Sequence, residues 1–118
     1  MKVKRGDVAL AMFPHAIGAP GNKRPVVIVQ SDAYNQSLQN MVVAEITSNL
    51  GRVADPAHLL LDLSTPEGQA TGLLRDSLVS CINLATVNES RIDRVIGSLS
   101  DTMMAKLDDC LQNALGLP

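Results

Sequence analysis

Aromatic residues are almost absent from this 118-residue chain, which contains one Phe, one Tyr and no Trp. Domains that bind single-stranded nucleic acid by base stacking use several exposed aromatic side chains. Peptide-binding modules of the SH3 type need an aromatic-lined groove. Phe13 and Tyr34 alone cannot form either surface, so the composition argues against both kinds of binding module.

Cysteine and histidine are also too few and too scattered for a disulfide framework or a zinc site. The two cysteines, Cys81 and Cys110, form no C-x-x-C pair, and His15 and His58 each stand alone in the chain. Structural zinc sites and disulfide scaffolds both require closely spaced ligands or several cysteines. We therefore expect neither a metal nor another cofactor.

The chain has no apolar run of membrane-spanning length, so no contact with a membrane is expected. Its N-terminus resembles a signal peptide only superficially. Lys2, Lys4 and Arg5 precede the apolar run 8–13, but Asp7 interrupts the pattern and the run is too short. These observations predict a soluble, cytoplasmic protein.

The net charge of −2 hides an uneven distribution. Residues 1–52 contain six basic and three acidic side chains, whereas residues 53–118 contain four basic and nine acidic ones. The overall acidity argues against a general nucleic-acid coat protein. A local basic patch on an acidic body remains compatible with this distribution.

Apolar patterning and turn residues predict short strands followed by one amphipathic helix. The strands are expected at residues 7–12, 25–30, 41–46, 58–62, 77–82 and 92–98, and the helix at 101–115. Ser31 and Asp32 are expected to cap a short helical turn, Ser100 and Gly116 to bound the long helix, and 15–23 and 65–72 to be loops. The pattern predicts one domain, 1–118, of mainly β structure with a C-terminal helix (α+β), in which the helix packs on a small barrel.

The helix has an apolar stripe, and one strand is apolar on both faces, which together predict more apolar surface than a single small barrel buries. A symmetric homodimer is the expected solution. The stripe consists of Met103, Met104, Leu107, Leu111, Ala114 and Leu115.

The densest turn signal lies directly before that strand. Gly21 and Asn22 tolerate positive φ, and Pro25 pushes Arg24 into an extended conformation. Four β-branched residues follow at 26–29, and they favour a strand buried on both faces. Arg24 would then be fixed at the mouth of a rigid element, where a guanidinium can bind a phosphate through two parallel hydrogen bonds. The alternative is an ordinary hairpin corner with a solvated basic pair.

Five ordered segments together resemble the MazF/PemK/Kid family of toxin–antitoxin ribonucleases. They are 5–8 (RGDV), 23–27 (KRPVV), 45–48 (EITS), 71–77 (TGLLRDS) and 98–101 (SLSD). The resemblance implies an SH3-like barrel dimer that cleaves single-stranded RNA at short sequences without a metal. The products would be a 2′,3′-cyclic phosphate and a 5′-hydroxyl, and an acidic antitoxin would block the RNA groove.

The resemblance also implies roles for particular residues. Arg24 matches the catalytic arginine of the family, and Thr47 matches a hydroxyl that holds a phosphoryl oxygen or the 2′-hydroxyl. Ser48 should point the other way if the strand pleat continues. Further substrate contacts are expected from Gly18, Asn22, Lys23, Ser48, Arg52, Ser80 and Asn83, and RNA is expected in a groove near Lys23, Arg24 and Arg52.

The chain departs from the family pattern where relatives have acids or bases. Ala19 replaces a glutamate, and Ser80 and Ile82 stand in place of an Arg-x-Asp pair. Two candidate proton acceptors remain open. Glu45 lies on the same strand face as Thr47, about 7 Å away along the chain, and His15 lies on a loop that could close over the substrate.

A non-catalytic inhibitor or binding module on the same barrel is the leading alternative function. The gyrase-poisoning relatives of this fold use an aromatic C-terminal tail. Residues 116–118 are Gly-Leu-Pro and offer no such tail.

Overall fold

The computed structural model describes residues 2–14 and 23–118. Its strands form one antiparallel sheet in the order β4-β5-β3-β2-β1-β6. The strands are β1 (Asp7–Met12), β2 (Lys23–Ile28), β3 (Asn40–Thr47), β4 (His58–Leu61), β5 (Ser77–Asn88) and β6 (Ile92–Ser98). The helices are α1 (Asp32–Ser37), α2 (Pro66–Gln69), α3 (Asp101–Leu115) and the 3₁₀ turn η1 (Glu89–Arg91). The expected class, mainly β with a C-terminal helix, is confirmed.

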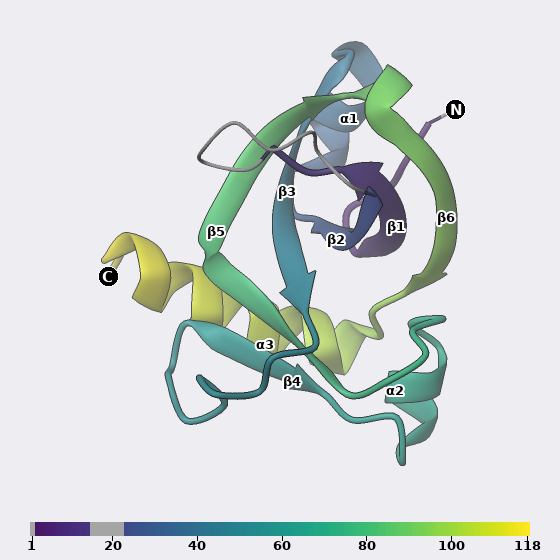
Figure 1. Ribbon diagram of the computed structural model, residues 1–118. Helices are drawn as coiled ribbons and strands as arrows, with labels where there is room; N and C mark the ends of the chain where they lie inside the picture. The colour runs from purple at the N-terminus through teal and green to yellow at the C-terminus, as the bar shows by residue number, and fades with distance from the viewer. Residues whose placement is uncertain (1, 15–22) are drawn as a thin grey trace.

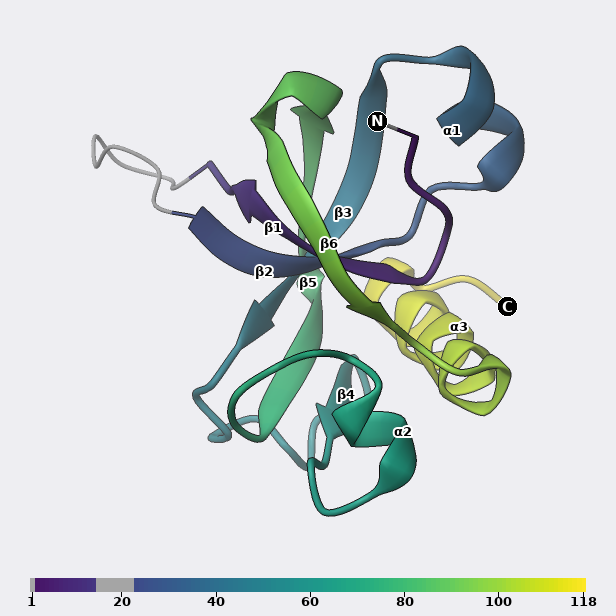
Figure 2. The ribbon, with the colours of Figure 1, turned by 90° about the vertical axis from the view of Figure 1, so that its right-hand side faces the viewer.

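The sheet curls into a barrel that stays open at one side. Figure 1 shows β5 and β6 arching around the inner strands, and both views place α1 at one end and α2 with β4 at the other (Figure 2). Within the described residues the edge strands β4 and β6 are not paired with each other. The loop after α2 covers part of the β6 edge instead, since the Ser98 N–H donates to the Ala70 carbonyl (3.1 Å).

Strand β2 is buried on both faces, as its β-branched run predicts. Val27 and Val29 belong to a core that packs beneath α3, whereas Val26 and Ile28 belong to a second core on the opposite face. Successive side chains of a strand point to opposite faces, so each core receives alternate residues. Arg24 therefore begins a strand that is held from both sides.

Helix α3 has the predicted bounds because both ends are encoded locally. The Ser100 hydroxyl accepts a hydrogen bond from the Met103 N–H (3.2 Å), and Gly116 adopts φ 68° at the C-terminus. The predicted stripe is wrong at its end, because Leu115 lies in the last turn and is 56% exposed. Cys110, which the stripe omits, is buried in the core.

Two further predictions need correction. The expected loop 65–72 contains the short helix α2, which begins where the Thr65 hydroxyl accepts from the Gly68 N–H (3.0 Å). Strand β5 extends to Asn88, well past residue 82. A bulge interrupts its pairing with β3 but does not end the strand, since Ala44 pairs with Leu84 whereas Glu45 pairs with Ser80. The alternation of side chains breaks at a bulge, so the sequence pattern does not predict that the strand continues.

In the described part of the chain, no helix is long and apolar enough to cross a membrane.

Candidate active site

A cleft of about 440 Å³ lies where β3 ends and β2 begins. Three arginines from separate segments line it: Arg24 of β2, Arg75 of the loop before β5, and Arg94 of β6. The hydroxyl-bearing residues Thr47, Ser48 and Ser77 also line it, and none of its lining residues among those described is acidic. We call this the arginine cleft. Its composition suits a polyanion such as a phosphodiester chain.

Arg24 is held between two neighbouring strands. It pairs with Ala11 of β1, and its Nη1 atom lies 3.7 Å from Glu45 Oε1 on β3. The Arg24 side chain is 39% exposed, whereas that of Glu45 is 16% exposed. Glu45 thus contacts the guanidinium from the neighbouring strand, and Arg24 lines the cleft.

Thr47 ends β3 in a side-chain-stabilised turn. Its hydroxyl accepts a hydrogen bond from the Asn49 N–H (3.1 Å), which competes with continuation of the strand. Ser48 therefore lies beyond the pleat and lines the same cleft as Thr47. The expectation that Ser48 points the other way applies to a pleat that continues past Thr47, whereas β3 ends at Thr47.

A second cleft, of about 500 Å³, adjoins the first at Thr47, which lines both. We call it the polar cleft. It brings together five residues that the sequence analysis singles out: Glu45, Thr47, Arg52, Ser80 and Asn83.

His58 also lines the polar cleft, although the sequence analysis considers it only as a zinc ligand and gives it no role. Its Nε2 atom lies 3.0 Å from the Ser80 hydroxyl, and its Nδ1 atom lies 3.4 Å from Asp55 Oδ1. Asn83 donates from Nδ2 to the same hydroxyl (3.0 Å). Ser80 of β5 stands opposite Glu45 of β3 on one side and His58 of β4 on the other, so these three residues form a row across the sheet. The sequence feature that could have indicated a role for His58 is the turn directly before β4.

That turn is built by Asp55. Its carboxylate accepts from the Ala57 N–H (2.8 Å), and this hydrogen bond is the main reason why the pKa of Asp55 lies below its usual value. The nearby His58 ring and the charge of Arg52 lower the pKa of Asp55 further. An ionised carboxylate therefore faces the His58 ring.

The match to known proteins covers nearly the whole chain. Residues 4–115 match the family described as PemK-like, MazF-like toxin of type II toxin–antitoxin system. The chain belongs to this family. It is 34% identical to Endoribonuclease EndoA of Bacillus subtilis (strain 168) over 118 residues, covering 99% of this chain and 97% of the relative. It is 32% identical to Endoribonuclease MazF6 of Mycobacterium tuberculosis (strain H37Rv) over 119 residues, covering 99% of this chain and all of the relative.

Solved structures support the PemK/MazF assignment. Mycobacterium tuberculosis toxin MazF-mt6 superimposes with a TM-score of 0.75 and 26% identity, covering 95% of this chain and 98% of that one. A mycobacterial endoribonuclease in complex with its cognate antitoxin shares the fold at a TM-score of 0.76 and 23% identity, covering 98% and 97% of the two chains. The family resemblance read from the sequence is thus confirmed.

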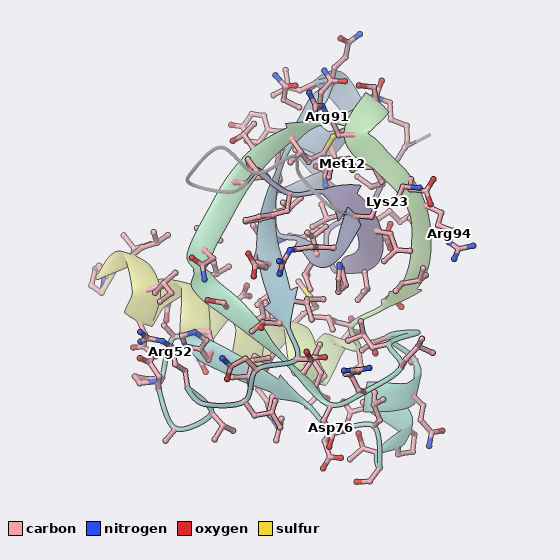
Figure 3. All side chains as sticks on the ribbon, in the orientation of Figure 1. Met12, Lys23, Arg52, Asp76, Arg91 and Arg94 are labelled. Atoms are coloured by element: carbon pink, nitrogen blue, oxygen red, sulfur yellow. The ribbon has the colours of Figure 1, made fainter. Side chains whose placement is uncertain are left out.

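Not every predicted site residue lies in these clefts. Lys23 lines neither cleft and pairs instead with Asp93 of β6 (3.4 Å). Figure 3 shows Lys23 near β6, well apart from Arg52 on the loop after β3. Arg75 and Arg94, which the sequence analysis does not single out, line the arginine cleft instead. Their positions depend on long-range pairing, which no local motif reveals.

The predicted residues His15, Gly18 and Asn22, and Ala19 with them, lie outside the described residues. Among the described residues, no three His, Cys, Asp or Glu side chains are grouped so as to hold a metal ion.

Proposed function

We propose that this PemK/MazF-family chain, residues 1–118 forming one toxin domain, is a metal-independent endoribonuclease that cleaves single-stranded RNA. The observation that carries the proposal is the arginine cleft. Three arginines and Thr47 line a space that no described acidic residue lines. Such an arrangement stabilises the negative charge that develops on a phosphoryl group.

The chemistry requires no protein nucleophile, because RNA supplies its own. The 2′-oxygen attacks phosphorus and the bond from phosphorus to the 5′-oxygen breaks, which leaves a 2′,3′-cyclic phosphate and a 5′-hydroxyl. Arg24 would neutralise the pentacoordinate transition state, and Thr47 would hold a phosphoryl oxygen or the 2′-hydroxyl. The proton of the 2′-hydroxyl passes to a base, and the leaving 5′-oxygen takes up a proton.

Glu45 is the described carboxylate best placed to be that base. It contacts Arg24 and lines the polar cleft together with Thr47, so it stands beside both proposed catalytic residues. Its ion pair with Arg24 gives it a second role in orienting the guanidinium. His15 remains the competing base.

We propose a homodimer and an acidic antitoxin as the protein partners, in the cytoplasm where RNA substrates are found. The family takes its description from toxin–antitoxin systems, and one solved relative is a complex with its cognate antitoxin. An acidic segment would bind across the arginine cleft by charge complementarity and exclude RNA.

The decisive experiment incubates the purified protein with long single-stranded RNA in excess chelator and maps the new ends. We expect discrete cleavage with 5′-hydroxyl ends, and Arg24→Ala should abolish it. Arg91→Ala is the matched control, since it removes one positive charge at η1, away from both clefts (Figure 3). Intact RNA that nevertheless binds in the arginine cleft would indicate the non-catalytic alternative.

A further inference from the structure

A chain of polar contacts runs from the buried interior of the polar cleft to its surface. The His58 side chain is 2% exposed and Ser80 is 1% exposed, so both are almost fully enclosed. Asn83, at the outer end, is exposed and lines the cleft. Asp55, at the other end, faces the His58 ring.

The hydrogen bonds in this chain run in one direction when His58 is neutral. Asn83 donates to the Ser80 hydroxyl oxygen, so the single hydroxyl hydrogen of Ser80 is available to His58 Nε2. The imidazole then carries its proton on Nδ1, which faces the Asp55 carboxylate. The Asn83 amide is oriented by the same contacts, since its NH₂ group faces Ser80 and its Oδ1 atom is left for a ligand in the cleft.

We propose that Asp55, His58 and Ser80 are positioning residues that fix Asn83 as a specificity-determining residue, with Oδ1 accepting from the exocyclic amino group of an RNA base. The proposal rests on the proposed nuclease function and names the class of base that the polar cleft takes, one that carries an exocyclic amine (adenine, cytosine or guanine) and not uracil. The polar cleft adjoins the arginine cleft at Thr47, so a base bound there belongs to a nucleotide next to the cleaved phosphate.

The test uses short RNAs containing the mapped cleavage sequence, in which each adenine, cytosine or guanine is replaced in turn by purine, 2-pyrimidinone or hypoxanthine. These analogues lack the exocyclic amine and keep the ring. At one position the wild-type protein should lose about tenfold or more in kcat/KM.

Three variants separate positioning from a purely structural role. Ser80→Ala should still cleave, but with little discrimination between the amine and its deletion. Asn83→Asp, which can only accept hydrogen bonds when ionised, should keep the preference for the amine. Asn83→Ala, on the exposed surface, should lose the preference even if Ser80→Ala does not fold.

The proposal is overturned if no amine deletion affects the wild type, or if folded Ser80→Ala keeps the preference for the amine. Absence of cleavage by the wild type would instead contradict the nuclease function. Equilibrium binding of the same RNAs, compared with and without the amine, then supplies the measurement for Asn83.

Discussion

The Arg24 guanidinium and the Glu45 carboxylate form an ion pair across the β2–β3 ladder, with 3.7 Å between Nη1 and Oε1. The two residues line different clefts, Arg24 the arginine cleft and Glu45 the polar cleft. Because Arg24 keeps 39% of its side chain exposed, the pairing orients the guanidinium without closing it to a phosphate. The pair therefore connects the proposed phosphate-binding residue with the proposed proton acceptor.

Arg24→Ala and Thr47→Ala should each reduce turnover by about a hundredfold or more, because each removes a preorganised donor to the phosphoryl group. Arg24→Lys should recover only part of the loss, since an ammonium cannot form the bidentate contact. Single-turnover cleavage assays measure the effect. Circular dichroism should show an unchanged fold, and wild-type rates from folded Arg24→Ala protein would refute the mechanism.

Glu45→Gln should slow cleavage while leaving RNA binding intact or slightly tighter. If Glu45 is the base, the acidic limb of the pH–rate profile should disappear in this variant. If Glu45 only orients Arg24, the rate should fall but the limb should persist. Cleavage as fast as in the parent would make this carboxylate part of the scaffold, and His15→Ala becomes the next variant to measure.

Gly72→Ala should destabilise the wall of the arginine cleft. Gly72 has φ 74°, and an added Cβ would lie 2.1 Å from the Ile96 carbonyl oxygen of β6. Gly116→Ala is the matched control, because Gly116 has φ 68° with open space around the same position. The control should cost about 1–2 kcal/mol for the left-handed backbone alone, and Gly72→Ala more. Equal unfolding free energies for the two variants would contradict the predicted contact.

Acid should destabilise the fold below about pH 4, where carboxylates with lowered pKa values become protonated. The pKa of Asp32 lies below 3.8, chiefly because it accepts from the Arg5 N–H and then from Asn35. A lowered pKa adds stability above the unfolded-state value, and this contribution disappears as pH falls through the folded value. Urea unfolding between pH 3 and 6 should show the decline. In Asp32→Asn the unfolding free energy should decline less steeply with falling pH. An unchanged slope would contradict the contribution of Asp32.

The thiols should be inert in the folded protein. Burial raises the pKa of Cys81 to about 12 and also raises that of Cys110, so almost no thiolate is present at pH 8. A thiol reagent should modify neither residue under native conditions and both in denaturant. Rapid labelling of native protein at pH 8 would show that the core beneath α3 opens locally.

Local signals predict the parts of the fold that local contacts determine. Strand β1 and helix α3 have the predicted bounds, the helix because Ser100 and Gly116 act on their own neighbours. The same signals predict Arg24 at the start of a strand buried on both faces. They cannot predict the groups that long-range pairing assembles. His58 meets Ser80 only through the β4–β5 register, and Arg24, Arg75 and Arg94 line one cleft only because the sheet curls.

The bulge in β5 has a consequence for how this chain can change over evolution. Residues 81–83 stand opposite no residue of β3, so the ladder does not depend on their side chains in the way it depends on Ser80 or Leu84. Asn83 is in this segment, at the mouth of the polar cleft. Substitutions at this position can therefore be sampled with little loss of folding. A small library at positions 82 and 83 is a practical route to nucleases that recognise new RNA sequences.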